Sequence, residues 1–366
     1  MSTLWSFTPL DSCFFREAKP FNASEGGFLN SQFPPPAQTL AGSFRNTIGE
    51  LLGADWEDYR TNPGNHIRKV IGSPDSPSPL TFSGPYILFQ HERIYPAPLH
   101  LLYRIRTQTK DQIFEWRRLQ PGEKVISDMG AVSLPEVINK LEGGRLPEKI
   151  WLNRTDFEAV LNGGSPAGGI SESHLVKDEN RAGIGRNNQR STVAEGLLYF
   201  VRHMRLCDQV SFGIVVEGMP ENNKLSEEVL TRLGGEGRLA NLSRMPEKVT
   251  LPAAPKLSGG EKGLILTLLT HGEFSGKPEP NWASINAELG VNLTLESACV
   301  GKPVREGGWD YAKRQPKPLI SLVPAGSSYF VRVTGDIAQA FNALHGKKIG
   351  NRTEFGYGEI VAGLWT

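Results

Sequence analysis

Residues 328–365 read SYFVRVTGDIAQAFNALHGKKIGNRTEFGYGEIVAGLW, and this stretch decides the fold class. Its first six residues are typical of a strand. Apolar side chains then recur at helical spacing from Ile337 to Leu344, with Asp336 placed to cap the helix and Gly346 placed to end it. Alternating side chains in the last ten residues predict a closing strand. The stretch therefore predicts strand, helix and strand in quick succession.

Working towards the N-terminus, the same kinds of pattern recur. The first 15 residues predict a strand, and apolar positions from Leu40 to Leu52 lie on one helical face between Pro36 and Gly53. Residues 85–90, 99–106 and 113–119 are typical of strands, and one side of the middle segment is basic. Together these elements predict an α+β fold of two tandem ferredoxin-like (RRM-like, split βαβ) domains with long loop insertions.

The expected domains meet at residues 195 and 196. The N-terminal domain, 1–195, would carry a basic protruding loop or hairpin at 162–196, where seven glycines accompany Lys177, Arg181, Arg186 and Arg190. The C-terminal domain, 196–366, would end in a glycine-rich loop.

Other segments give further expectations. Residues 54–84 hold four prolines and predict a long surface loop. Short helices are expected at 134–141, 155–161 and 225–233, and a pair of strands at 197–206 and 209–217.

Composition limits the function classes. In 366 residues, 40 Lys and Arg stand against 39 Asp and Glu, so a nucleic-acid surface would have to be a local patch. The three cysteines, Cys13, Cys207 and Cys299, are too far apart for a CxxC zinc site or a disulfide framework. With neither a signal peptide nor a membrane-spanning run, the protein is expected to be cytoplasmic, with no membrane partner.

Catalytic and cofactor motifs are missing from the sequence. The sequence GIGRNN at 183–188 lacks the third glycine of a dinucleotide site, and no phosphate-binding loop of the GxxxxGK type is present. The seven histidines have no metal-ligand spacing. His100 and His203 come closest to a catalytic role because each lies near an expected strand and near arginines. We therefore expect neither catalysis, nor a metal, nor a cofactor.

The glycines that flank Tyr357 suggest a phosphate contact. Gly356 and Gly358 would let backbone N–H groups approach an RNA phosphate without a side chain in the way. The alternative is that they serve the turn and its close packing.

Six motifs together resemble the third subunit of the Cmr complex, a RAMP-superfamily protein of type III-B CRISPR effectors. They occur in the order found in that family and span residues 5 to 365. They are LDSCFFREAKPF (10–21), FPPPAQTLAGSFRN (33–46), RAGIGRNNQRSTVAEGLLY (181–199), LGGEGR (233–238), VPAGSSYF (323–330) and FGYGEIVAGLW (355–365).

The resemblance implies two ferredoxin-like domains without a catalytic centre. Such a subunit binds the 5′ handle of the CRISPR RNA, docks on the large polymerase-domain subunit and adjoins the RAMP backbone subunits. Arg16, Lys19 and Arg45 would contact handle phosphates. Arg181, Arg186 and Arg190 would lie on a finger against RNA. The alternative for Arg45 is a solvated helix residue paired with Asn46 or Glu50.

Two other function classes stay open at this point. A RAMP endoribonuclease that processes precursor CRISPR RNA shares the fold, but it needs a general acid and base at a scissile phosphate. A purely structural subunit would touch protein only. Cleavage assays in EDTA and RNA crosslinking separate the three.

Overall fold

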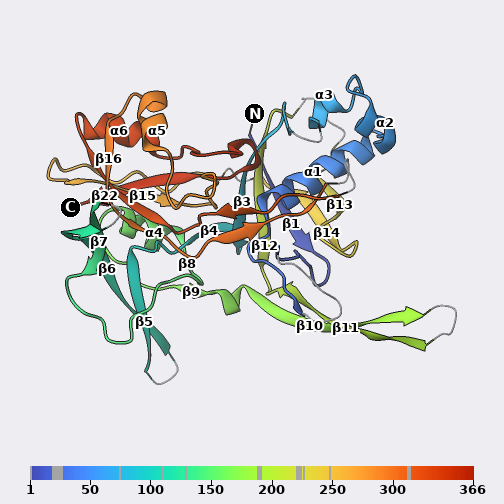
Figure 1. Ribbon diagram of the computed structural model, residues 1–366, viewed down its shortest axis with the longest axis horizontal. Helices are drawn as coiled ribbons and strands as arrows, with labels where there is room; N and C mark the ends of the chain where they lie inside the picture. Colours follow the sequence, from blue (N-terminus) through green and yellow to red (C-terminus); the bar gives the residue numbers. More distant parts are fainter. Residues whose placement is uncertain are drawn as a thin grey trace. The chain divides into compact units, whose positions relative to one another are not determined.

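Antiparallel strands dominate the computed structural model, which describes residues 2–18, 28–73, 76–108, 111–127, 130–187, 192–219, 225, 227–246, 249–310 and 315–366. Six α-helices accompany the strands in these ranges, which confirms the expected α+β class (Figure 1). No helix of the described residues is both long enough and apolar enough to cross a membrane.

The chain divides into two compact units, each made of three segments. Unit 1 comprises Met1–Glu92, Ser173–Lys248 and Arg305–Ile320, and unit 2 comprises Arg93–Glu172, Val249–Val304 and Ser321–Thr366. The expected boundary at residues 195 and 196 falls inside β11 (Thr192–Leu206), a strand of unit 1. This division differs from the expected one because β11 pairs with β10 (Val176–Asn187) on both sides of residues 195 and 196, so both sides of the expected boundary belong to one hairpin of unit 1.

Unit 1 is built on an antiparallel sheet. Its strand order is β13 (Glu228–Arg232), β14 (Leu239–Arg244), β1 (Thr3–Pro9), β12 (Val210–Glu217) and β3 (Thr81–Phe89). The expected helix after Pro36 is α1 (Ala37–Leu51), and it packs on this sheet. Phe44 of α1 lies with its ring 5.5 Å from Trp5 of β1 and 6.0 Å from Phe82 of β3, so aromatic edge contacts join helix to sheet.

Unit 2 contains the stretch that decided the fold class. The strand, helix and strand expected there are β21 (Ser328–Val333), α6 (Ile337–Leu344) and β22 (Ile360–Trp365), and the Asp336 carboxylate caps α6. The antiparallel sheet order is β16 (Leu293–Cys299), β21, β15 (Gly263–Leu268) and β22, with α5 (Trp282–Leu289) between β15 and β16 in the chain. Tyr329, Phe341 and Ile360 are among the buried side chains of its core.

The remaining elements are short or belong to ribbons. Unit 2 has a three-stranded ribbon of β5 (Leu101–Gln108), β6 (Asp111–Ser127) and β7 (Gly130–Val137). It also has β8 (Ile150–Leu152), α4 (Arg154–Leu161), β9 (Ile170–Ser171) and the 3₁₀ turn Thr353–Phe355. The others are β2 (Phe28–Leu29), β4 (Glu92–Pro96), the 3₁₀ turn Glu172–His174, β17 (Val304–Glu306), β18 (Trp309–Asp310), β19 (Gln315–Pro316) and β20 (Ile320–Leu322).

Four expectations for local structure are wrong. The expected loop 54–84 contains α2 (Trp56–Thr61), capped by the Asp55 carboxylate, and α3 (Arg68–Ile71). The expected helices at 134–141 and 225–233 are strands β7 and β13, because pairing with β6 and β14 overrides the short apolar spacing. Strands β11 and β12 do not pair with each other, since β11 pairs with β10 and β2, whereas β12 pairs with β1 and β3.

Candidate nucleic-acid interface

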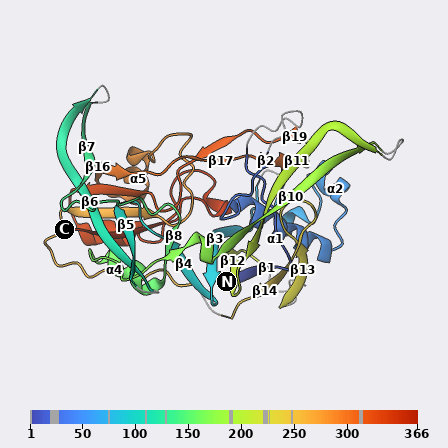
Figure 2. The same ribbon diagram turned by 90° about the horizontal axis from the view of Figure 1, so that it is seen from below.

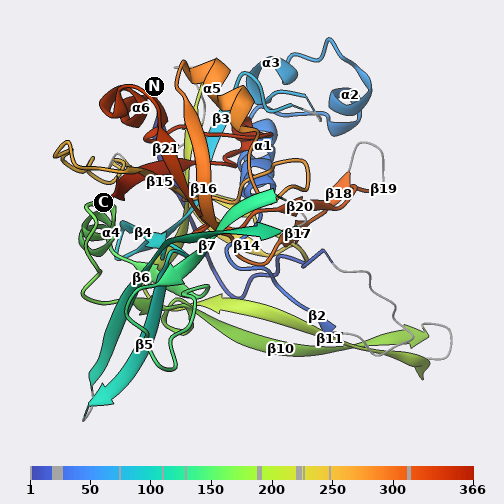
Figure 3. The same ribbon diagram turned by 60° about the vertical axis from the view of Figure 1, so that its left-hand side comes forward.

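The hairpin of β10 and β11 carries the arginines that the sequence singled out. Its register runs from Val176 opposite Leu206 at the base to Asn187 opposite Thr192 at the far end. At about 3.4 Å per residue, a strand of this length reaches about 40 Å. Figures 1, 2 and 3 show the hairpin as a ribbon that extends away from the sheet of unit 1. Of the two forms expected for the 162–196 segment, loop or hairpin, the structure has the hairpin.

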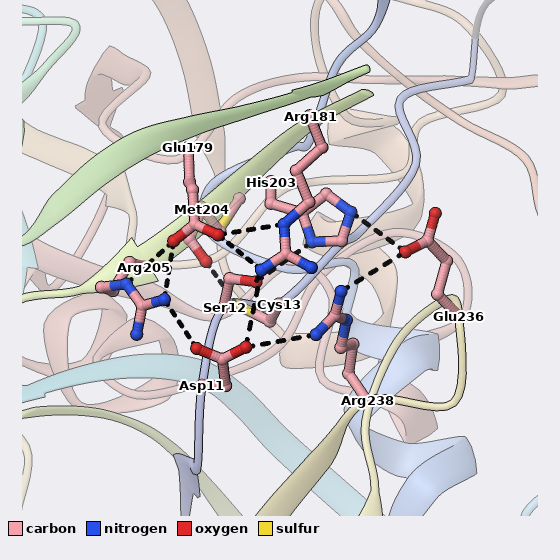
Figure 4. Close-up of polar contacts among 10 residues, drawn as sticks. All are labelled: Asp11, Ser12, Cys13, Glu179, Arg181, His203, Met204, Arg205, Glu236 and Arg238. Carbon is pink, nitrogen blue, oxygen red and sulfur yellow. Dashed lines mark hydrogen bonds and ion pairs between the residues drawn. The ribbon is translucent and has the colours of Figure 1, made fainter. Parts of the chain in front are cut away.

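Asp11 holds together the base of the hairpin (Figure 4). This residue follows β1, and its carboxylate accepts hydrogen bonds from three guanidinium groups. The nearest nitrogens lie at 2.6 Å for Arg205, 3.2 Å for Arg238 and 3.5 Å for Arg181. Because Arg181 and Arg205 belong to opposite strands, one carboxylate links both strands of the hairpin to the sheet.

Two further carboxylates complete this base network. Glu179 of β10 accepts from Arg181 at 2.5 Å and from Arg205 at 2.7 Å. Glu236 lies 3.6 Å from Arg238. Three arginines therefore meet three carboxylates, and the charges of the base network balance when His203 is neutral.

The pKa values of these groups follow from the pairing. Hydrogen bonds from Arg181 and Arg205 lower the pKa of Glu179, and the hydrogen bond from Arg205 lowers that of Asp11. The hydrogen bond to Glu179 raises the pKa of Arg205. Asp11 and Glu179 are thus ionised at neutral pH, and Arg181 and Arg205 already have anionic partners.

His203 sits beneath this network and is closed to solvent. Its Nδ1 lies 3.2 Å from the Ser12 hydroxyl and its Nε2 lies 3.1 Å from a carboxylate oxygen of Glu236. The ring stacks on Phe14 with centroids 5.3 Å apart. Burial lowers the pKa of His203, opposed by Glu236, so the imidazole is neutral at pH 7. Ser12 and His203 are buried, so a scissile phosphate has no access to this serine, histidine and carboxylate series.

Arg45 has a structural role instead of the expected phosphate contact. Its guanidinium donates to the carbonyl oxygens of Ile71 and Ser73, each at 2.5 Å, and to the Tyr59 hydroxyl at 3.0 Å. These contacts bind α1 to the segment that contains α2 and α3. The Glu50 carboxylate accepts from Asn46, so the pairing considered for Arg45 is not formed either.

The glycine-rich turn is used internally and does not present its amides to a ligand. The N–H of Gly356 donates to Thr353 and that of Gly358 donates to His271, at 3.1 and 2.8 Å. Tyr357 is buried, with 1% of its surface exposed. The structure therefore corrects the expected phosphate cradle: the two glycines adopt φ values of +103° and +76° and serve the turn.

The other expected RNA contacts have different positions. Arg16 is exposed, and its backbone bridges to Ser31. The backbone of Arg186 pairs with Val193 in the outer half of the hairpin. Lys19 and Arg190 lie outside the described residues, as does the side chain of Arg186.

Sequence reasoning missed most of the base network. Arg181 and His203 were singled out, but Asp11, Glu179, Arg205, Glu236 and Arg238 were not assigned to a shared cluster. The available signal was the run DENR at 178–181, in which Glu179 and Arg181 stand two residues apart, so an acid and a base lie on the same face of one strand. Among the described residues, no group of His, Cys, Asp or Glu side chains could hold a metal ion.

With the hairpin and its base defined, the comparison with protein families becomes informative. A family model described as CRISPR-associated protein (Cas_Cmr3) matches residues 5–365. The chain belongs to this Cas_Cmr3 family. The comparison with curated proteins gave no match.

Solved structures place the Cas_Cmr3 chain among proteins of similar fold. A chain of the type III-B Cmr-beta bound to cognate target RNA, determined by cryo-EM, shares 14% identity with a TM-score of 0.51; the match covers 98% of this chain and 96% of that chain. A chain of the same complex bound to cognate target RNA and AMPPnP shares 14% identity with a TM-score of 0.49, covering 89% and 86%. At this identity the first likeness shows a common fold.

Proposed function

We propose that this Cas_Cmr3 chain is a non-catalytic subunit of a type III-B CRISPR ribonucleoprotein that binds the 5′ handle of the CRISPR RNA. In the same assembly it docks on the large polymerase-domain subunit and adjoins the RAMP backbone subunits. The family match over residues 5–365 carries this proposal. The cryo-EM chain of similar fold comes from a Cmr-beta complex that is, by its description, bound to cognate target RNA, which supports RNA as the ligand class.

The hairpin is the proposed finger against the RNA. The base network fixes the base of the hairpin, and the paired strands continue outward from it. Arg186 lies in that outer half, and Arg190 stands between the two strands in the sequence. Arginines at these positions would neutralise phosphates, together with Arg16 and Lys19 at the N-terminal motif.

Arg181 takes a positioning role in this proposal. Its guanidinium is bound to Asp11, Ser12 and Glu179, so its charge is compensated within the protein. Arg45 and the turn at 356–358 are likewise excluded from the RNA surface by their internal hydrogen bonds.

The strand order supports a tandem of split βαβ domains. In unit 2 the chain order β15, α5, β16, β21, α6, β22 gives the sheet order β16-β21-β15-β22. In unit 1 the strands β1, β3, β12 and β14 give the order β14-β1-β12-β3, and α1 lies between the first two. Both sheets place the fourth strand beside the first, and the third between the first and second. Unit 1 departs from the pattern because β13 replaces the second helix.

We propose that the chain is not catalytic because its two best candidates for an acid or base, His100 and His203, are buried. His203 has 0% and His100 has 2% of its surface exposed. Burial also lowers the pKa of both, so neither is an acid available at pH 7. We expect the purified chain to leave RNA intact in EDTA. Cleavage at a defined phosphate that is lost in His100→Gln or His203→Gln would establish the endoribonuclease instead.

Salt-dependent RNA binding tests the finger. The variant Arg186→Ala/Arg190→Ala should reduce the slope of log affinity against log salt by about 1.4, because each single-strand phosphate contact contributes about 0.7. The control Lys69→Ala/Arg244→Ala removes two exposed charges from the same unit and should leave the slope unchanged. If the slope for Arg186→Ala/Arg190→Ala equals that of the control variant, the hairpin does not contact RNA phosphates. RNA binding absent from the wild-type chain would favour a subunit that touches protein only.

A further inference from the structure

The ribbon formed by β5 and β6 of unit 2 is drawn in Figure 3. One of its faces carries a second set of arginines. Cross-strand partners share a face, so Arg104, opposite Glu115, lies on the face opposite to Tyr103 and its partner Trp116. Two-residue steps place Arg106 and Arg117 on the same face as Arg104. This face borders an open hollow of about 580 Å³, which Lys140 and Glu142 also line. We call it the ribbon hollow.

The wall of the ribbon hollow is held in place by hydrogen bonds. The backbones of Tyr103 and Arg145 exchange two hydrogen bonds of 2.9 Å. Arg104 donates from Nη1 to the carbonyl oxygen of Glu142, also at 2.9 Å. The loop that carries Lys140 is therefore fixed beside β5.

Charge in the ribbon hollow is not balanced. Glu115 accepts from Arg104 at 2.5 Å and from Arg106 at 2.6 Å, so one carboxylate serves two guanidinium groups. Neither Arg117 nor Lys140 forms an ion pair with a described carboxylate. With Glu142 included, four cations face two anions. The hydrogen bond from Arg104 and the nearby arginine charges lower the pKa of Glu115, as expected where positive charge is in excess.

The arrangement favours a repeated anion over a single one. Along the ribbon, Arg106, Arg104 and Arg117 follow one another at two-residue steps, because Arg117 lies opposite Leu102. The step from Arg106 to Arg104 along β5 is about 6.8 Å, similar to the spacing of successive phosphates in an extended strand, and Arg117 lies one step further along on the neighbouring strand β6. A free nucleotide would need only one of these positions, and an enclosed pocket would suit it better.

Two aromatic side chains of the ribbon, Phe114 and Trp116, also line the ribbon hollow. Tyr103, Phe114 and Trp116 stack with one another at centroid distances of 5.6 to 6.0 Å. They pack against the buried cluster of Tyr95, Phe157 and Val361 rather than standing free to stack on bases. Contacts made by the arginine face alone carry no sequence information.

We propose that the ribbon hollow binds the phosphate backbone of single-stranded RNA, independently of base sequence. This inference rests on the proposed function and adds to it a surface in unit 2 that is separate from the hairpin.

The test uses the full chain and two double variants. The first, Arg117→Gln/Lys140→Gln, removes the two cations of the ribbon hollow that form no ion pair among the described residues. Lys256→Gln/Lys277→Gln removes two exposed cations elsewhere in unit 2 as the control. RNA affinity is measured from 0.05 to 0.3 M salt, with an RNA that contains a CRISPR handle and a scrambled RNA of the same length.

The ribbon variant should lower the salt slope by about 1.4, which corresponds to about 25-fold weaker binding at 0.1 M salt when affinity at 1 M is unchanged. The loss should be equal for both RNAs, and the melting temperature should match that of the control. In the wild type, crosslinked RNA should map to peptides of β5 and β6, which keeps the test valid if the variant folds poorly.

Three results would overturn the proposal. Unchanged binding with no crosslinks in the ribbon, while the hairpin variant loses affinity, would refute the ribbon hollow alone and leave a protein partner as its occupant. A loss confined to one RNA sequence would refute backbone recognition. Failure of the wild-type chain to bind any RNA would refute this inference and the proposed function together.

Discussion

Replacing Gly358 by alanine should destabilise unit 2 strongly while leaving RNA affinity unchanged. Gly358 has φ of +76°, and a Cβ there would lie deep inside the contact distance of the Ile349 carbonyl oxygen. Ile349 donates its N–H to Gly358 at 2.9 Å, and Gly358 donates to His271 at 2.8 Å. The new methyl group must push the backbone segments of Ile349 and Gly358 apart.

The expected cost can be worked from its parts. A left-handed conformation costs a residue with a Cβ about 1–2 kcal/mol. Breaking the two backbone hydrogen bonds adds about 1 kcal/mol each. The total is about 3–4 kcal/mol, or a fall in melting temperature of about 6–16 °C for a folding unit of this size.

Gly290→Ala supplies the matched control. Gly290 ends α5 with φ of +64°, but nothing lies within 4 Å of the added Cβ. Only the conformational cost applies, so the control should lose about 1–2 kcal/mol. Melting of the full chain is followed by circular dichroism, and RNA affinity is measured well below both transitions.

Two outcomes would refute this reasoning. If Gly358→Ala has the same melting temperature as Gly290→Ala, the close backbone contact with Ile349 is not the reason that glycine is required. If Gly358→Ala melts like the wild type but loses RNA affinity, the phosphate cradle expected from the sequence is restored.

Two further predictions concern buried groups. Arg45→Ala should lower the free energy of unfolding by about 3 kcal/mol or more, because Ile71, Ser73 and Tyr59 lose a charged hydrogen-bond donor. The slope of RNA affinity against salt should stay unchanged. A reduced slope in a stable variant would mean that Arg45 contacts RNA. For His100, burial and, to a lesser extent, Arg118 hold the pKa well below its ordinary value, so below about pH 6.5 the unfolded chain binds a proton that the folded chain does not. The free energy of unfolding should therefore be greatest above pH 6.5 and fall as the pH decreases towards the folded pKa. Urea titrations at pH 7, 6 and 5 should show a smaller acid loss in His100→Gln, and an identical loss would contradict this assignment.

The sequence was most informative where structure is local. The stripe ending at Leu344, with Asp336 before it and Gly346 after it, predicted α6 because helix periodicity and caps involve neighbours in the chain. Strand β21 was predicted for the same reason. Family membership was also legible, since six ordered motifs extend over nearly the whole chain.

Tertiary structure decided what the charged and glycine residues do. Arg45 reads as a surface cation in the sequence, but α2 and α3 fold over it and supply its acceptors. Asp11 gains its role only when β10, β11 and the loop at Arg238 bring three guanidinium groups to one carboxylate. Strands β7 and β13 were mistaken for helices because each takes its conformation from a partner strand. Such partners are set by long-range packing, so the single sequence encodes them without displaying them.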